Sequence, residues 1–211
     1  HCVTRRQRQM CIRDSSKKTP NFLVAEKSIS VSNLVNGTTR LQPVVLQIGQ
    51  VAGLIASESI KKNINTDQID IRDIQAKFLD KGGYIQPYLD VKKNHPFFKV
   101  YQRIGSTGIL KGHGFNVGWS NQNWFYPEKN IDFKELMKDL SVYFNLKTHP
   151  LNDLKIDTIF KWISLISKTE INNTHKIWIE LGLKNFNKNR LIQRGEFAVI
   201  GNVESKKIRY L

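Results

Sequence analysis

The segment with the clearest chemical potential runs from Gly37 to Gly53 and joins a turn to a helix. The run Gly-Thr-Thr-Arg at its start predicts a turn, and the apolar residues that follow predict a helix with Pro43 in its first turn, where proline is tolerated. Such a turn delivers the Arg40 side chain and a row of unpaired backbone N–H groups to one point, which is a ready site for partial negative charge. The structural alternative, a helix start that only needs a cap, stays open on these residues alone.

Outside this segment, the chain offers no self-contained catalytic or metal-binding set. None of the five histidines is paired with another His, a Cys or a carboxylate at ligand spacing, which argues against a metal site. The sequence has no Gly-x-Ser-x-Gly elbow and no cysteine after Cys11, and Asp67, Asp70 and Asp73 are typical of a solvated helix face. We therefore assign neither a catalytic residue nor a metal ligand.

Residues 105–126 combine glycines with aromatic side chains. Their glycine spacing is like that of a dinucleotide-binding turn, but no buried strand precedes Gly112 and no amphipathic helix follows it, so we expect a structural Gly-rich loop. The aromatic run after it is also expected to be a loop. Its members could stack on a sugar or a base, although in a small domain such residues more often belong to the core. They are Trp119, Trp124, Phe125 and Tyr126.

Residues 1–15 differ in composition from the rest of the chain. They hold four Arg, no Lys and both cysteines, whereas residues 16–211 hold six Arg, 23 Lys and 18 Asn. The run from Met10 to Ser15 can be back-translated to a transposase adapter sequence read in frame. We therefore expect residues 1–15 to be adapter-derived and disordered, and the natural chain to extend upstream, which makes the remainder a C-terminal fragment.

Charge and hydropathy exclude several classes of protein. The formal charge of +15 is spread along the chain and mixed with acidic residues, which indicates a solvated surface and no nucleic-acid partner. The purely apolar runs are only a few residues long and no secretory signal is recognisable, so we expect no transmembrane segment. Two cysteines are too few for a disulfide framework.

The first half of the chain predicts a strand, a turn and two helices before a domain boundary near residues 82–87. These elements are a strand at Phe22–Ala25, a turn at 33–40, a helix at 41–62 and a helix at 66–81 that ends at Gly82-Gly83. In the first helix Gly49, Gly53 and Ser57 lie four residues apart on one ridge, which predicts close packing against another backbone. The missing upstream chain is the expected partner of that ridge.

The second half of the chain contains a faint internal repeat. Each copy is a helix that ends at a glycine, a hydrophobic pair, a loop and a second helix start. The first copy consists of Tyr101–Leu110 and Ile131–Leu136, and the second of Ile177–Leu183 and Ile192–Phe197. In the first copy Asp132 and Glu135 predict a capping box, whereas Gln193 is a poorer cap and predicts a looser helix start.

Five separated elements of residues 20–62 resemble one protein family. They are Phe22-Leu-Val-Ala25, Ile29-Ser30, Gly37-Thr-Thr-Arg40, Pro43 and Gly49-Gln-Val-Ala-Gly53. In this order they are similar to the C-terminal flavin-domain segment of glutathione-reductase-like FAD-dependent oxidoreductases. The resemblance implies that residues 16–84 are a truncated piece of a flavin-binding α/β domain, with FAD as the cofactor. It also places the phosphate-binding strand and helix in a missing N-terminal domain.

The resemblance further implies which residues contact the cofactor. In the family, the strand and this helix start close over the flavin and its ribityl chain, so the role falls to Ile29, Ser30, Arg40, Gln42, Pro43 and Val44. The helix N-terminus would then face a flavin oxygen and favour the anionic reduced form. Glu26 and Lys27 stand where Gly-Arg is common, so no ribityl or pyrophosphate contact is carried over to them. We expect the parent to be an FAD-dependent oxidoreductase and the fragment by itself to be inactive.

Residues 85–211 resemble, more weakly, the surface-layer-homology repeats. Tyr88-Leu-Asp-Val91, Gly108-Ile-Leu110 and Ile131…Glu135 carry the first copy, and Ile192, Arg194, Glu196 and Phe197 carry the second. The resemblance implies a helical repeat-like domain whose partner is a glycan or another cell-envelope component. The alternative function is therefore an envelope or carbohydrate-binding module attached to another enzyme, with a periplasmic or cell-envelope location. The expected fold class is mainly α with a small α/β remnant.

Overall fold

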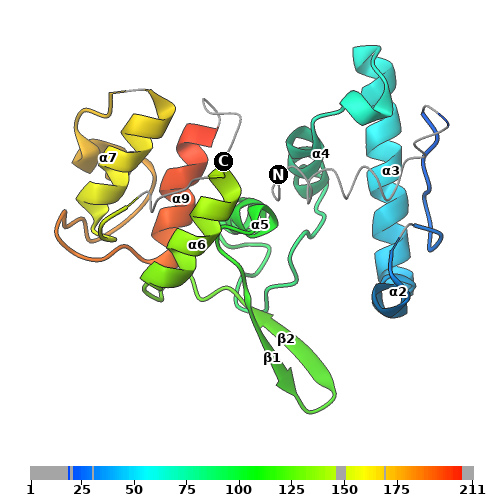
Figure 1. The fold of residues 1–211 in the computed structure, drawn as a ribbon, viewed down its shortest axis with the longest axis horizontal. Helices are drawn as coiled ribbons and strands as arrows, with labels where there is room; N and C mark the ends of the chain where they lie inside the picture. The colour runs from blue at the N-terminus through cyan, green and yellow to red at the C-terminus, as the bar shows by residue number, and fades with distance from the viewer. Residues whose placement is uncertain (1–18, 20, 30, 146–150, 169, 206–211) are drawn as a thin grey trace. The chain divides into compact units, whose positions relative to one another are not determined.

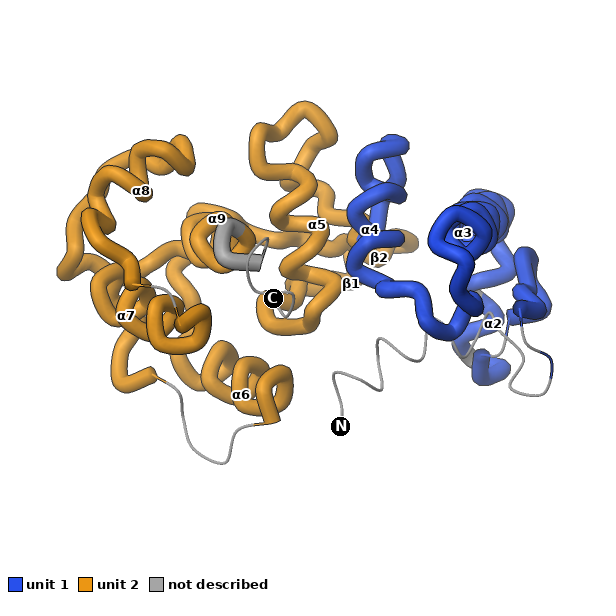
Figure 2. The backbone as a smooth tube through the Cα atoms, turned by 90° about the horizontal axis from the view of Figure 1, so that it is seen from above, with its two compact units in different colours: residues 1–85 blue, residues 86–211 orange. Residues whose placement is uncertain are grey.

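The chain forms two compact units, residues 1–85 and residues 86–211 (Figure 2). The computed structural model describes residues 19, 21–29, 31–145, 151–168 and 170–205, and the adapter-like residues 1–15 lie outside this set. The architecture is mainly helical with a small two-stranded sheet, which confirms the expected fold class. Each unit has its own buried apolar side chains.

Unit 1, residues 1–85, is built around one long helix (Figure 1). Its described elements are α2 (Asn33–Thr39), α3 (Gln42–Lys62), the 3-10 helix η1 (Thr66–Gln68) and α4 (Ile71–Asp80). Helix α3 begins one residue after the predicted start and has Pro43 in its first turn, as predicted. Asn63 ends it in the left-handed conformation, and Lys61 and Lys62 lie in the last turn, where positive charge is favourable.

Two elements expected in unit 1 are wrong. The predicted turn at 33–40 is the helix α2, because the Ser32 side chain accepts a hydrogen bond from the Val35 N–H at 3.3 Å and caps the helix start. The predicted strand at Phe22–Ala25 is reduced to a single bridge at Leu23. A strand needs a neighbouring strand to pair with, and the described part of unit 1 contains none.

The second predicted helix, 66–81, is divided in two. The Asp70 side chain accepts a hydrogen bond from the Arg72 N–H at 2.8 Å and starts α4 as a new helix. At the other end of α4 the Gly83 N–H donates to the Phe78 carbonyl at 2.9 Å, and Gly82 has a φ of 81°, so the helix stops at the glycine pair as predicted.

The core of unit 1 brings α3, η1 and α4 together. Buried Ile55, Ile69 and Ile74 form its centre, against which Leu23, Val51, Leu54 and Ile64 pack. A Cβ at Gly49 would lie 3.4 Å from the Ala25 carbonyl oxygen, so this glycine allows the N-terminal segment to approach the helix closely. A Cβ at Gly53 would meet nothing within 4 Å among the described residues. The ridge of small residues predicted on α3 therefore packs against another backbone segment at Gly49, whereas no described residue packs against it at Gly53.

Unit 2, residues 86–211, is a group of helices from which one β-hairpin extends (Figure 1). Its described elements are α5 (Phe98–Thr107), β1 (His113–Val117), β2 (Ser120–Trp124), α6 (Phe133–Phe144), α7 (Ile156–Ser167), α8 (Thr174–Glu180) and α9 (Arg194–Ser205). Helix α9 packs against α5 and α7. Phe125 and Trp178 are fully buried, and Trp162 is nearly so, which gives this unit a core of large aromatic side chains.

The hairpin replaces the two loops expected between residues 105 and 126. β1 and β2 are antiparallel, with His113 opposite Trp124 and Val117 opposite Ser120. Gly118 starts the connecting turn with a φ of 57°, the conformation that tight hairpin turns require and that glycine adopts at little cost. The glycines of this region thus serve a strand pair, which the sequence alone did not reveal.

The internal repeat is visible in the order of elements. Helix α5 ends at Gly108 with a φ of 79°, and α8 is followed by Gly182 with a φ of 71°. Each copy then continues to another helix, α6 in the first and α9 in the second. The two copies therefore use the same left-handed glycine exit after their first helix.

The starts of α6 and α9 are fastened by opposite halves of a capping box. Before α6, the Asp132 carboxylate accepts from the Glu135 N–H at 2.8 Å, as predicted. Before α9, the Glu196 carboxylate accepts from the Gln193 N–H at 2.9 Å and also binds Arg190 through two hydrogen bonds of 2.8 and 2.6 Å. The looser start predicted from Gln193 is therefore tied down by Glu196 instead.

Candidate functional site

The junction between α2 and α3 carries most of the residues proposed to contact a cofactor. Leu41, with φ −69° and ψ 140°, is the one extended residue between the two helices. Arg40 is the C-terminal cap of α2, and its backbone N–H donates to the Asn36 carbonyl at 3.2 Å. The positive charge of Arg40 therefore sits at the negative end of a helix, which is a favourable structural position in its own right.

The start of α3 exposes fewer backbone donors than the sequence predicts. Pro43 has no N–H, and the N–H groups of Val44 and Val45 both donate to the Leu41 carbonyl at 3.0 Å. Among the described residues, no side chain caps this end and the first turn has no acidic residue. Within the described part of the chain, the N–H groups of Leu41 and Gln42 have no hydrogen-bond acceptor. The expected row of unpaired N–H groups is therefore shorter than predicted, because proline and a tight first turn remove the others.

The six candidate residues differ in where they lie. Arg40, Gln42 and Pro43 are exposed at the junction, and Val44 is half-buried beside them. Ile29 is half-buried in a bend before α2, and Ser30 lies outside the described residues. The junction therefore brings four of the six together because they are neighbours in the chain. The groups that could contact a ligand of partial negative charge there are the Arg40 guanidinium and the free backbone N–H groups at the start of α3.

The opposite end of α3 is closed by charged side chains. Glu58 is 5% exposed and pairs with Lys77 of α4 and, at 3.9 Å, with Lys61. The hydrogen bond from Lys77 lowers the pKa of Glu58 below its ordinary value. This ion pair joins the C-terminal half of α3 to α4.

Much of the α3 surface remains apolar and uncovered. Leu46 is 72% and Ile60 81% exposed, and Leu41 at the start of the helix is more than half exposed. Within the part of the chain that the structure describes, α3 is also long and apolar enough to cross a membrane by length and composition, a test that the core helix of a globular domain passes as well. The expectation of no transmembrane segment is thus qualified for this one helix.

A second group of side chains, in unit 2, forms hydrogen bonds with the residues that flank the β1–β2 hairpin, which we call the hairpin root. Arg194 is 3% exposed, and its guanidinium donates to the carbonyls of Phe125, at 2.8 Å, and Lys111. These two residues flank the hairpin on either side. Burial lowers the pKa of Arg194, whose guanidinium also lies 5.3 Å from the centre of the Phe125 ring.

Asp90 holds the same root from another side. Its carboxylate accepts hydrogen bonds from the Phe125 N–H at 2.8 Å and the Tyr126 N–H at 2.6 Å. The Leu89 N–H donates to the Asn123 carbonyl at 2.9 Å, which adds a backbone contact. Sequence reasoning noted Asp90 and Arg194 only as parts of a family-like pattern. A charged residue within each repeat copy was the available signal, but its target could not be inferred.

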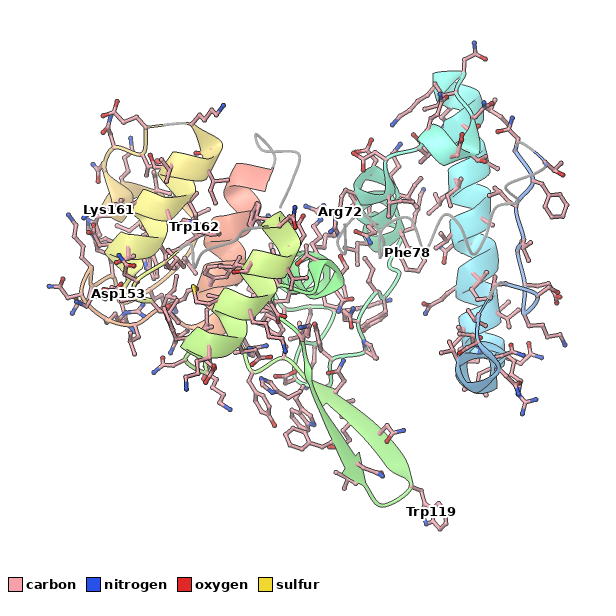
Figure 3. All side chains as sticks on the ribbon, in the orientation of Figure 1. Arg72, Phe78, Trp119, Asp153, Lys161 and Trp162 are labelled. Atoms are coloured by element: carbon pink, nitrogen blue, oxygen red, sulfur yellow. The ribbon has the colours of Figure 1, made fainter. Side chains whose placement is uncertain are left out.

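The aromatic side chains near the hairpin divide into buried and exposed ones. Phe125 is fully buried, as a core residue should be, whereas Trp119 is fully exposed at the far end of the hairpin (Figure 3). The rings of Trp124 and Tyr126 stack with centroids 5.8 Å apart and planes 12° apart. Burial lowers the pKa of His113 at the root of β1. The expectation that these aromatic residues form the core is therefore wrong for Trp119.

Comparison with known proteins gives one match, in unit 1. The family model described as FAD dependent oxidoreductase matches residues 15–78. No curated protein and no solved structure is significantly similar to the chain. The match covers the α2–α3 junction and most of α4, supports a function related to FAD-dependent oxidoreductases, and implies FAD as the cofactor.

Proposed function

We propose that residues 16–84 are the C-terminal piece of the FAD-binding domain of an FAD-dependent oxidoreductase, and that the α2–α3 junction closes the flavin site. The family match over residues 15–78 is the observation that carries the proposal. The exposed Arg40 side chain and the open Gln42 N–H fit a group of partial negative charge, such as a flavin oxygen. They do not amount to a phosphate cradle, which fits the assignment of that role to a missing N-terminal domain.

The described residues would orient and tune the cofactor rather than react. Bound FAD supplies the redox chemistry, and the protein supplies binding, orientation and electrostatics. Arg40 and the N-terminus of α3 would stabilise negative charge on the flavin ring system, while Pro43 and Val44 would give it an apolar wall. A helix end contributes about 0.3–1 kcal/mol to a nearby charge, and up to about 2 kcal/mol when partly buried. No catalytic residue is proposed in this chain.

The uncovered surface of α3 supports the view that this unit is part of a larger domain. Three large apolar side chains of this region, Leu41, Leu46 and Ile60, are each more than half exposed. Burial of such side chains contributes about 1.5–3 kcal/mol each, so a complete domain would cover them. We propose that the remainder of the flavin domain does so, and that isolated residues 1–211 neither retain FAD nor act as an enzyme.

The test uses the full-length parent and compares two variants. Arg40→Ala combined with Pro43→Gly should weaken flavin retention or lower the flavin potential, because it removes one charge and loosens the helix start. Lys81→Ala, which removes an exposed charge beyond the end of α4, serves as the control and should change neither. A parent without flavin absorbance, or a double variant with unchanged flavin content and potential, contradicts the proposal.

A second candidate function concerns unit 2. The projecting hairpin with its exposed Trp119 favours a binding module, directed at a glycan or another component of the cell envelope. This function is independent of the flavin proposal, because none of its residues lies in the matched segment. Limited proteolysis that releases unit 2, followed by a binding assay on the released fragment, tests whether the module acts by itself.

A further inference from the structure

The exposed apolar side chains of the hairpin increase in exposure toward its tip. At the root, His113 and Trp124 are half-buried. Further along β1, Phe115 is 47% and Val117 51% exposed, and both lie on one face of the strand because they alternate. Trp119, in the turn, is fully exposed (Figure 3). The most exposed apolar side chain of the hairpin is thus the one farthest from the root.

Hydrogen bonds fix the hairpin root, so the tip of the hairpin is held in a defined position within unit 2. Arg194 binds carbonyls on both sides of the hairpin, and Asp90 binds two successive N–H groups after β2. Their hydrogen bonds go to backbone atoms beside the hairpin, which fixes its position without involving its tip. Trp119 therefore contributes nothing to the described core of unit 2, and its position calls for an external partner.

The charge distribution indicates what kind of surface this partner has. Residues 112–127 contain no Asp, Glu, Lys or Arg, so no charge has to leave water when the tip is buried. Unit 2 as a whole holds 20 Lys and Arg against 11 Asp and Glu, an excess that attracts anionic surfaces. An uncharged apolar tip on a basic domain is complementary to a membrane with anionic headgroups.

We propose that the β1–β2 hairpin inserts its tip, Val117 to Trp119, into the interface of an anionic lipid membrane. Tryptophan is enriched at such interfaces because its ring is apolar and its N–H remains able to hydrogen-bond. A lipid surface surrounds the tip on all sides, which matches an exposure that peaks in the turn. A saccharide would instead favour a platform of several ring faces, and Trp124 and Tyr126 each use one face against the other. The proposal specifies the second candidate function, on which it rests.

The experiment measures binding of the 211-residue chain to vesicles by sedimentation. The vesicles contain phosphatidylcholine alone or phosphatidylcholine with phosphatidylglycerol. We expect binding to the anionic vesicles, weakened by salt, and a loss of about tenfold in affinity for Trp119→Ser, the ratio expected when one large apolar side chain no longer enters the interface. Leu165→Ser, which alters a 77% exposed apolar side chain of α7, is the matched control and should bind like the unaltered chain.

The lipid proposal is overturned by no binding to either vesicle, by equal loss in both variants, or by unchanged binding of Trp119→Ser in a chain whose circular dichroism shows it folded. Polysaccharide binding or dimerisation that depends on Trp119, without vesicle binding, also overturns it. The polysaccharide outcome would leave the binding-module function standing, so the two proposals fail separately. Flavin content of the parent is not affected in any of these outcomes.

Discussion

Replacing Arg194 by methionine removes the guanidinium that holds the hairpin root while keeping a long side chain in the core. The change deletes the hydrogen bonds to the carbonyls of Phe125 and Lys111 and the contact of the guanidinium with the Phe125 ring. Arg194 is 3% exposed, so water cannot simply replace the lost donors. The two carbonyl oxygens are left without these partners.

The expected loss follows from these contacts. A hydrogen bond to a charged group contributes about 1.5–3 kcal/mol, and an unsatisfied buried acceptor costs about 1–3 kcal/mol. Against this, methionine avoids the cost of burying a charge, which is several kcal/mol per ion. We therefore expect Arg194→Met to lower the free energy of unfolding of unit 2 by about 2–4 kcal/mol. Arg103→Met is the control, because Arg103 is half-buried and its hydrogen bond to Asn202 is long, at 3.4 Å.

Urea unfolding followed by tryptophan fluorescence measures this effect in unit 2 alone, because all four tryptophans lie in residues 86–211. The control should lose less than about 1 kcal/mol. Hydrogen exchange of the Phe125 and Tyr126 amides, which Asp90 holds, should also accelerate in Arg194→Met. If the two arginine variants unfold at the same urea concentration, the reasoning about the hairpin root is refuted.

Three further outcomes follow from the structure. Because Lys77 lowers the pKa of Glu58, this pair stabilises folded unit 1 above the ordinary carboxyl pKa of 4.5, and the stabilisation is lost as the pH falls below that value. The unfolding temperature of Glu58→Gln, measured by circular dichroism, should therefore fall less on acidification than that of the unaltered chain. Gly105→Ala would place a Cβ against the buried Tyr88 hydroxyl oxygen and should cost about 1–3 kcal/mol by urea unfolding, of which Tyr88→Phe in the same chain should restore a part; no restoration would locate the clash elsewhere. Limited proteolysis should cut at residues 82–87 and release a protected C-terminal fragment, whereas even degradation from both ends would argue against two independently folding units.

The elements with strong local signals were predictable from the sequence. The apolar run with an early proline predicted α3, and the glycines at 82 and 108 predicted helix ends, because these features act within a few residues. Helix α2 was missed because its Asn-Gly pair suggested a turn and outweighed the Ser32 cap three residues before Val35. The error arose because two short-range signals, the Asn-Gly pair and the Ser32 cap, predict different structures for the same residues.

The arrangements that depend on distant contacts were not predictable in the same way. The hairpin was missed because glycines and asparagines dilute its alternating pattern, and its strands are stabilised by a root that Arg194 reaches from far along the chain. The position of the candidate site at Arg40 to Val44 stays a prediction. The number of free backbone donors at the start of α3 could not be predicted, because the hydrogen bonds of Val44 and Val45 to the Leu41 carbonyl depend on the detailed geometry of the first turn.

The grip of Arg194 on the hairpin has a consequence for the order of events during protein synthesis. The carbonyls it binds precede it by 69 and 83 residues, so the hairpin root cannot be completed until the start of helix α9 has left the ribosome. Until then, of the two charged residues Asp90 and Arg194, only Asp90 has been synthesised and can hydrogen-bond to the hairpin root. A nascent chain stopped before residue 194 would therefore carry the exposed Trp119 on a hairpin whose root lacks the Arg194 hydrogen bonds, open to association with other chains until helix α9 is released.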